Sequence, residues 1–286
     1  MSEQVYQTAI LGATFYGMAA ALSEPGTVII ERSGSIGNDF VASLNEKPLR
    51  TLDTKSPLGL DFKQNLKARG LTDESGAVYS GPSLYVVSDY LKKANTELLL
   101  LTEVVKIEKA GDYYILTVYN NEGFSQINAR NVLDTTATGV LHDWADRVPR
   151  SKKLGVIVKT NLSPSASDPS GSPKCEMLHN PISGLSILHI PINAEDGWIE
   201  ARKKLHSFWK AEGLEQSGAR IAFVATEFAY TMPETMKKVK NDWFWIPSCS
   251  FRNLMEAFDQ GALFHSSKKD LNARREVETE CCCVKG

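Results

Sequence analysis

The fold is decided by the stretch Val5-Tyr6-Gln7-Thr8-Ala9-Ile10-Leu11-Gly12-Ala13-Thr14-Phe15-Tyr16-Gly17, followed by Thr27-Val28-Ile29-Ile30-Glu31. An apolar run meets a glycine turn, a helix pattern rich in small residues covers 15–22, and a second apolar run ends in a carboxylate. Pro25-Gly26 ends the helix. Strand, helix and strand within about 30 residues predict a βαβ unit with parallel strands and a right-handed crossover.

The glycine turn is typical of a dinucleotide site. In the pattern Gly-x-Gly-x-x-Gly, the first glycine allows a tight bend, the second lets the backbone approach a pyrophosphate, and the third lets helix and strand pack closely. Gly12 and Gly17 fill the first and third roles, and Thr14 stands where the second glycine belongs. Thr14 adds a Cβ at the point of close approach, although its hydroxyl can hydrogen-bond a phosphate.

Glu31 strengthens this interpretation because it follows the second strand about 20 residues after the turn. A carboxylate there can accept hydrogen bonds from ribose hydroxyls, and its charge disfavours the 2′-phosphate of NADP. The alternative is an ordinary solvated carboxylate at a strand end.

Length and composition limit the number of domains and the kinds of partner that we expect. The 286 residues are enough for one large or two modest domains, and the net charge of −2 gives no reason to expect a nucleic-acid partner. The densest basic group, Lys237, Lys238 and Lys240, is typical of a solvated face. No apolar run approaches the ~20 residues of a membrane span, and no signal sequence is visible, so we expect a cytoplasmic protein without a membrane partner.

The five cysteines do not form a disulfide framework. Cys175 and Cys249 are single, and Cys281-Cys282-Cys283 lie in a tail at 271–286 that we expect to be flexible. A redox relay or a soft-metal site is the alternative for the triplet. The histidines show no metal-ligand spacing, and we expect no metal site.

The middle of the chain predicts an inserted meander. Glycine and proline punctuate 33–82, which we expect to be an excursion from the core, with a short helix at 39–44. A helix is expected at 84–94. Apolar and alternating runs then predict a strand at 97–101 and extended segments at 104–108, 113–119, 124–129 and 131–134, with a hairpin turn at 120–123.

Beyond Gly139 the composition changes. Residues 140–180 are rich in loop-forming types, and a strand at 185–192, a helix at 198–212, a strand at 221–228 and a last helix at about 253–264 follow. We therefore expect an α/β protein with a Rossmann-like domain, formed by 1–144 and 246–270, and a smaller α+β substrate or cap domain at 145–245.

Three blocks resemble FAD-dependent oxidoreductases of the glutathione-reductase fold. Residues 27–40, Thr-Val-Ile-Ile-Glu-Arg-Ser-Gly-Ser-Ile-Gly-Asn-Asp-Phe, look like the second strand and the following loop of that family. There, Glu-Arg lies by the adenosine and a Gly-Gly loop approaches the flavin. Gly37 matches the first of these glycines, and Asn38 replaces the second.

The other two blocks follow in the family's order. Leu101-Thr102-Glu103-Val104-Val105 resembles the strand whose valine meets adenine through its backbone. Residues 131–139, Asn-Val-Leu-Asp-Thr-Thr-Ala-Thr-Gly, resemble the block that closes over the pyrophosphate, with either 135–137 or 137–139 in that place. The resemblance covers about the first half of the chain and implies FAD as cofactor, held by Gly12, Ala13, Thr14, Phe15, Tyr16, Gly17, Glu31, Arg32, Gly37, Asn38, Val104, Val105, Thr135, Thr136 and Ala137.

The chain departs from the family near its C-terminus, where no clear Gly-Asp block precedes the last helix. If the fold is complete, backbone N–H groups near Phe251, Arg252 and Asn253 can stabilise negative charge at the flavin N1–C2=O edge. The alternative is a plain helix that packs the core.

The remaining candidates each have an ordinary explanation. Trp243, Phe244 and Trp245 can wall a substrate pocket, although large aromatic residues more often form cores. Cys249 can be a flavin-reactive thiol or a buried small side chain. His142 follows the third block and can approach the cofactor or lie elsewhere.

These observations favour an FAD-dependent oxidoreductase, an oxidase or dehydrogenase, acting on a small molecule or on a substrate delivered by a partner. The absence of a second Gly-x-Gly-x-x-Gly gives no sign of a separate NAD(P)H domain. A catalytically degenerate dinucleotide-binding partner subunit is the alternative, and NAD as the dinucleotide is a weaker one. The sequence identifies neither a catalytic residue nor the substrate, and it leaves a partner protein or a homo-oligomer open.

Overall fold

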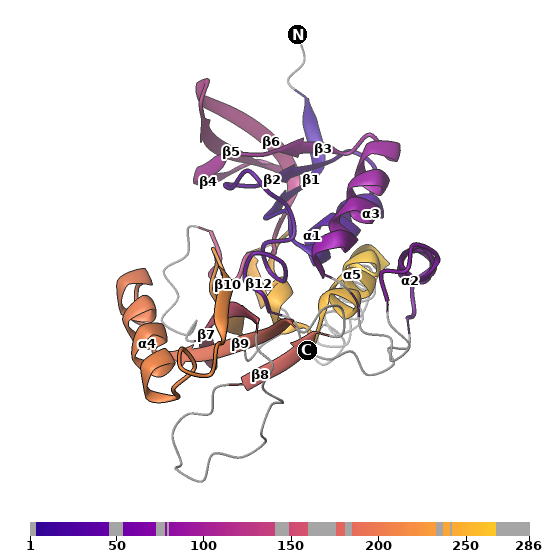
Figure 1. The fold of residues 1–286 in the computed structure, drawn as a ribbon. Coiled ribbons are helices and arrows are strands. Elements are labelled where there is room, and N and C mark those ends of the chain that lie inside the picture. Colours follow the sequence, from indigo (N-terminus) through magenta and orange to yellow (C-terminus); the bar gives the residue numbers. More distant parts are fainter. Residues whose placement is uncertain are drawn as a thin grey trace, which may run out of the picture.

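The computed structural model describes residues 4–45, 54–72, 78, 80–140, 149–159, 176–180, 185–232, 237–240 and 242–266. Within these ranges an eight-stranded sheet forms the larger part of the molecule (Figure 1). Its strands are β1 (Val5–Leu11), β2 (Thr27–Ile30), β3 (Glu97–Leu99), β4 (Glu103–Ala110), β5 (Tyr113–Asn120), β6 (Gly123–Asp134), β12 (Lys237–Lys240) and β13 (Trp243–Trp245).

The centre of this sheet is parallel. The strand order is β12-β13-β6-β1-β2-β3, and β1 pairs in parallel with β2 on one side and with β6 on the other. Thr8 lies opposite both Thr27 and Asn131. The expected βαβ unit is confirmed, with α1 (Phe15–Leu22) as its crossover helix. The carboxyl ends of β1, β2 and β6 therefore meet at one edge of the sheet.

On one face of the sheet, α1 packs against β1 and β2, α3 (Ser80–Lys93) and α5 (Leu254–Ala262) pack on α1, and α2 (Pro57–Ala68) packs on α3 and α5 (Figure 1). Their buried side chains form one apolar cluster with Ile10, Ile29 and Leu133 of the strands. The expectation that 33–82 lies outside the core is wrong for α2, because Phe62 and Leu66 are fully buried in this cluster.

The meander β4–β5–β6 covers the other face. Ala9, Leu11, Val28 and Ile30 point to this side and form a second apolar cluster, in which Leu116 of β5 is fully buried. The alternation along β1 follows from the period of two in a strand. The expected inserted antiparallel meander is confirmed, and residues 123–134 form a single long strand rather than two.

A second, antiparallel sheet has the order β10-β7-β9-β8, with β11 also paired to β7. Its strands are β7 (Ser151–Lys159), β8 (Glu176–Asn180), β9 (Leu185–Ile192), β10 (Arg220–Val224) and β11 (Ala229–Thr231). Helix α4 (Trp198–Ala211) packs on it through Ala201, Leu205 and Trp209. The fold class, an α/β sheet with a smaller α+β unit, is confirmed.

Two expectations about this part of the chain need correction. Residues 151–159 are a central strand of the second sheet, although the composition of 140–180 favoured loops. Residues 237–240 and 243–245, which the expected cap domain at 145–245 included, pair within the large sheet, where β13 pairs in parallel with β6.

The two sheets meet through residues 39–45. This segment forms turns instead of the expected short helix, and its Leu44 packs against Ile187 and Ala225. A ring nitrogen of His189, Nε2, lies 2.7 Å from the Leu44 carbonyl oxygen. Added at Gly155, a Cβ would lie 2.8 Å from the Ser43 carbonyl oxygen, so a residue without a side chain permits this contact.

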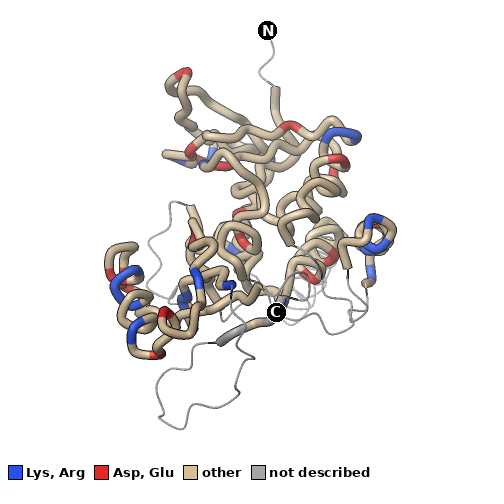
Figure 2. The backbone as a smooth tube through the Cα atoms, in the orientation of Figure 1, with Lys and Arg blue, Asp and Glu red and all other residues tan. Residues whose placement is uncertain are grey.

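The distribution of charged residues does not indicate a binding partner. Lys and Arg alternate with Asp and Glu along the backbone drawn in Figure 2 rather than gathering into a field of one sign. None of the helices in the described ranges is long and apolar enough to cross a membrane.

Candidate functional site

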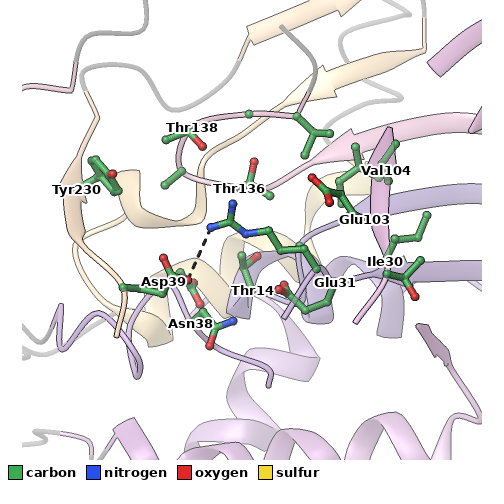
Figure 3. A pocket seen from close by; sticks show the side chains of 18 of the residues that line it. Thr14, Ile30, Glu31, Asn38, Asp39, Glu103, Val104, Thr136, Thr138 and Tyr230 are labelled. Atoms are coloured by element: carbon green, nitrogen blue, oxygen red, sulfur yellow. Dashed lines mark ion pairs between the residues drawn. The ribbon is translucent and has the colours of Figure 1, made fainter. Parts of the chain in front are cut away.

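A cleft of about 320 Å³ opens at the carboxyl ends of β1, β2 and β6 (Figure 3). The β4 strand and the segment leading into β11 contribute to its walls. The lining residues are Leu11, Gly12, Thr14, Ile30, Glu31, Arg32, Asn38, Asp39, Thr102, Glu103, Val104, Thr136, Ala137, Thr138, Gly139, Val140, Glu227, Phe228 and Tyr230. This edge is where ligands bind in open parallel sheets.

The glycine turn at the floor of the cleft depends on both of its glycines. Gly12 has a φ of +92°, which disfavours any side chain, and a Cβ there would lie 3.0 Å from Thr136 Cγ2. A Cβ on Gly17 would lie 2.7 Å from the Gly12 carbonyl oxygen. The two glycines therefore have the conformational and packing roles that the sequence predicts.

Thr14 is the N-cap of α1. Its Oγ1 accepts a hydrogen bond from the Gly17 amide at 3.0 Å and donates to Thr135 Oγ1 at 2.8 Å. The hydroxyl proton is therefore engaged inside the protein, in place of the suggested bond to a phosphate. A threonine at this position stabilises the helix start, because the first turn has amides without intrahelical partners.

The other amides at the start of α1 also have partners within the chain. The Ala13 amide donates to Glu31 Oε2 at 2.9 Å, and the Phe15 amide donates to Asp39 Oδ2 at 3.2 Å. The Tyr16 amide donates to Ser248 Oγ at 3.3 Å. A helix N-terminus favours negative charge, and here a carboxylate of the chain takes that position.

Asp39 is the most perturbed acidic group of the cleft. Burial raises its pKa to about 7, while hydrogen bonds from Ser248 and the Phe15 amide act in the opposite direction and the nearby Glu31 adds to the rise. The Ser248 hydroxyl donates to Asp39 Oδ2 at 2.5 Å. Oδ1 is buried and has no hydrogen-bond partner among the described residues. A buried oxygen in this state is costly unless a proton or a ligand satisfies it.

Glu31 is held by backbone amides. Its Oε1 accepts from the Ser33 amide at 2.8 Å, and its Oε2 accepts from the Ala13 amide. The residue is 7% exposed, so it is not the solvated strand-end carboxylate considered as the alternative. Its two oxygens retain further lone pairs that can accept hydrogen bonds at the cleft wall.

Asp134 shapes the loop on the opposite wall. It is fully buried at the end of β6, and its Oδ1 accepts from the amide and the hydroxyl of Thr136. Its Oδ2 accepts from the Val140 amide at 2.5 Å. Residues 136–139 are thereby held against the cleft, which they all line, whereas Thr135 lies beneath the turn and donates to the Leu11 and Gly12 carbonyl oxygens.

One ion pair spans the cleft. Arg32 and Glu227 both line it and pair at 3.7 Å, the contact dashed in Figure 3. The Arg32 side chain is 71% exposed, so the pair contributes little stability. Glu227 comes from the chain between β10 and β11, and the pair therefore links the large sheet to the second one.

The predicted cofactor residues divide into four groups. Eight line the cleft: Gly12, Thr14, Glu31, Arg32, Asn38, Val104, Thr136 and Ala137. Six support it or neighbour it from the turn, the following loop and β4: Ala13, Phe15, Tyr16, Gly17, Gly37 and Val105. Thr135 lies beneath the turn, and the C-terminal three, Phe251, Arg252 and Asn253, are absent from the described lining.

Those C-terminal three residues have other contacts. The Phe251 ring stacks on Tyr16 with centroids 5.2 Å apart, and Arg252 pairs with Glu256. Asn253 is the N-cap of α5, and its Oδ1 accepts from the Glu256 amide at 2.9 Å. Their proposed role toward a flavin stays a prediction.

The aromatic and thiol candidates are core residues. Trp243, Phe244 and Trp245 are each no more than 4% exposed within β13, which agrees with the packing alternative. Cys249 is buried beside Met232 and Trp245. His142 lies outside the described residues, as do Cys175 and the cysteine triplet at 281–283.

Sequence reasoning missed the roles of Asp39, Glu227 and Tyr230. Asp39 was visible as an acidic residue beside Gly37 in the loop after the second strand, but no pattern links a loop carboxylate to a helix start 24 residues away. Glu227 and Tyr230 reach the cleft through the second sheet, whose short β11 strand carries no periodic signal.

No family model matches the chain, and no curated protein matches it in sequence. Solved structures do match. A geranylgeranyl bacteriochlorophyll reductase-like protein from Thermoplasma acidophilum has a TM-score of 0.60 at 13% identity, covering 96% of this chain and 80% of that one. A p-nitrophenol 4-monooxygenase from Pseudomonas putida has a TM-score of 0.52 at 14% identity, covering 91% and 77%.

The flavin-dependent halogenase CmlS matches with a TM-score of 0.54 at 13% identity, covering 90% of this chain and 56% of the halogenase. The chain thus spans little more than half of the halogenase and about four fifths of the reductase-like protein. At these identities the likeness shows the fold that this chain shares with these proteins, and nothing of its activity. The narrower glutathione-reductase type stays a resemblance.

The fit of FAD to this cleft differs between its two ends. The glycine cradle at Gly12 and the amide-held carboxylate of Glu31 suit a nucleoside with free ribose hydroxyls. At the start of α1 the acceptor oxygens of Asp39 and Ser248 hold the amides that a phosphate would otherwise take. A neutral Asp39 would remove the conflict of charge at this end, while the Phe15 and Tyr16 amides keep their partners within the chain.

Proposed function

We propose that this chain binds FAD in the cleft and is an FAD-dependent oxidoreductase. The observation that carries the proposal is the position of Glu31, whose buried carboxylate lines the cleft one hydrogen bond away from the glycine turn. That position suits recognition of ribose hydroxyls at the end of the second strand of a βαβ unit.

Other residues of the cleft have matching roles in the proposal. Val104 and Thr102 form the wall beside Glu31, where an adenine would lie. The loop 136–139, fixed by Asp134, would close over the pyrophosphate. The large sheet with its helices, β12 and β13 included, would be the cofactor-binding unit, and the second sheet would be the substrate or cap unit.

Bound FAD supplies hydride or electron transfer, and the protein supplies binding, orientation and electrostatics. Phe228 and Tyr230 bring the second sheet to the same cleft, so a substrate bound there would lie beside the cofactor. The reaction class proposed is that of an oxidase or dehydrogenase, with a small molecule or a partner-delivered group as substrate.

A second candidate function is a dinucleotide-binding partner subunit without catalysis. Two observations favour it: the Asp39 carboxylate at the start of α1, and the stack of Phe251 on Tyr16 before α5. In both, side chains of the chain itself lie near the start of α1, where a cofactor would otherwise bind. The two candidates differ in whether bound FAD can be reduced and reoxidised while it remains on the protein.

Substitution of Glu31 tests the binding proposal. We expect Glu31→Gln to weaken FAD binding at least tenfold, about 1.4 kcal/mol, because an amide NH₂ group would then face the Ala13 or Ser33 amide and one acceptor toward the ribose is lost. Titration followed by quenching of flavin fluorescence measures the affinity.

The matched control is Glu122→Gln, which removes the same charge from the exposed turn between β5 and β6. It should bind FAD as the unmodified chain does. Equal FAD affinities for Glu31→Gln and the unmodified chain, with both folded by circular dichroism, would remove Glu31 from the site and with it the basis of the proposal.

A further inference from the structure

We propose that Asp39 sets the affinity of the cleft for the cofactor's pyrophosphate. Ionised, it places a negative charge beside the position of the phosphate groups; protonated, it removes that charge. This inference rests on the proposed function, since it concerns the same cleft, and it adds a residue and a proton to what FAD binding requires.

The geometry distinguishes the two carboxylate oxygens. Oδ2 has two donors, the Phe15 amide at 3.2 Å and the Ser248 hydroxyl at 2.5 Å. Oδ1 is buried without a hydrogen-bond partner among the described residues. A proton on Oδ1 therefore disturbs neither existing bond, and it removes the charge from a buried acceptor that has no donor among the described residues.

Because Asp39 lies at the start of α1, its charge affects how a phosphate binds there. Its Oδ2 meets the first residue of the helix, where the orientation of the backbone dipoles favours an anion. A phosphate arriving there would meet a like charge within a partly enclosed site, where screening by water is weak. Neutral Asp39 removes that repulsion.

The charged and titratable groups around Asp39 act in different directions. Glu31, at the end of β2, raises the Asp39 pKa, and burial raises it more. Arg32 and Glu227 lie in the same cleft as an ion pair whose charges cancel in part, and Tyr230 of β11 has a raised pKa and is neutral at ordinary pH. Glu103 also lines the cleft and adds a negative charge from β4.

If FAD binds only when Asp39 is protonated, FAD affinity must change with pH. Since Asp39 has a pKa of about 7, its neutral form is abundant below pH 7 and falls tenfold per pH unit well above it. FAD affinity should therefore be constant below pH 7 and fall by up to about tenfold per unit above it. Adenosine, which has no phosphate, should bind with the same affinity on both sides of pH 7.

The experiment measures binding of FAD and of adenosine to the full chain one unit below and one unit above the Asp39 pKa of about 7. The variants are Asp39→Asn, which is neutral at both pH values and keeps an acceptor for the Phe15 amide, and Asp39→Ser as a smaller second variant. We expect Asp39→Asn to abolish the pH dependence and to raise FAD affinity several-fold at the higher pH.

The matched control is Asp259→Asn. Asp259 is another buried carboxylate that accepts backbone amides, those of Lys55 and Ser56, but it lies outside the cleft lining. This variant should retain the pH dependence of FAD binding even if its thermal stability falls. Circular dichroism and thermal unfolding establish that each variant is folded.

The outcomes separate the two proposals. FAD affinity that falls above pH 7 in the unmodified chain and not in Asp39→Asn supports the inference. FAD affinity independent of pH in both, with binding intact, overturns the inference and leaves the proposed function standing. Failure of every folded variant to bind FAD at either pH overturns the proposed function and the inference together.

Discussion

At the scale of single residues, the chain replaces a glycine with a helix cap. Thr14 occupies the position where a glycine would permit close approach of a pyrophosphate, and its hydroxyl joins the Gly17 amide to Thr135. The residue stabilises the start of α1, and its side chain leaves less room for a ligand at the same position. Thr14 thus has a structural explanation independent of any cofactor.

The cap has a measurable contribution to stability. We expect Thr14→Ala to lower the free energy of unfolding by about 1 kcal/mol, since it removes the cap of α1 and the bond to Thr135. Thr14→Ser keeps the hydroxyl and should stay close to the unmodified chain. Denaturant unfolding of the three proteins checks this, and identical midpoints for the alanine and serine variants would contradict the capping role.

The residues of the site were only partly predictable. Glu31 follows from a local pattern, because the turn, the helix and the second strand fix its distance from Gly12 along the chain. Asp39 does not, because its role arises from a fold of the loop that brings its carboxylate to Phe15. The role of Ser248, more than 200 residues from Tyr16, depends on tertiary packing for the same reason.

At the scale of elements, α1 and α5 pack at the distance that one glycine allows. A Cβ added at Gly261 of α5 would lie 2.2 Å from the Tyr16 carbonyl oxygen of α1, a contact that backbone cannot accommodate without moving. The helix that follows residues 251–253 is thereby held against the turn of the cleft. The contact explains why a glycine stands inside a helix, where it is otherwise unfavourable.

Alanine at two helical glycines should therefore have opposite effects. We expect Gly261→Ala to lower the free energy of unfolding by about 2 kcal/mol or more, through a forced separation of α1 and α5. A Cβ added at Gly81 of α3 would meet no atom of the described residues within 4 Å, so Gly81→Ala should range from neutral to about 1 kcal/mol stabilising. Thermal unfolding measures both, and equal destabilisation by the two would contradict this explanation of the packing.

The elements were predictable where their pattern is local. The βαβ unit and the meander follow from strand and turn signals, and both are confirmed. Helix α2 was missed because Pro57 and Gly59 suggested a loop, although Ser56 caps the helix and a proline is favoured in its first turn. The three-residue β13 strand is buried on every side and shows no alternation.

At the scale of the whole molecule, one cleft joins the two sheets. The large sheet supplies the glycine turn and Glu31, and the second sheet supplies Phe228 and Tyr230. Residues 39–45 begin at Asp39 in the cleft and end in the second sheet's apolar cluster at Leu44. Asp39 therefore begins a segment that connects the two sheets.

The arrangement of the two sheets lay beyond sequence reasoning. Pairing of β13 with β6 joins residues more than 100 positions apart, and the contact between Leu44 and His189 joins segments about as distant. Such contacts depend on burial in the finished fold and leave no periodic signal in either segment. The likeness to the flavin-dependent halogenase, at 13% identity, is likewise visible in the fold, whereas the comparison with curated sequences finds no match.

The most direct test of FAD binding in the cleft is the amount of FAD that the purified full chain binds below pH 7. We predict a yellow complex with one FAD per chain, identified by mass after denaturation, and loss of that FAD in Glu31→Gln. A folded chain that takes up no FAD below pH 7, either as purified or after addition of the cofactor, would contradict the proposed function.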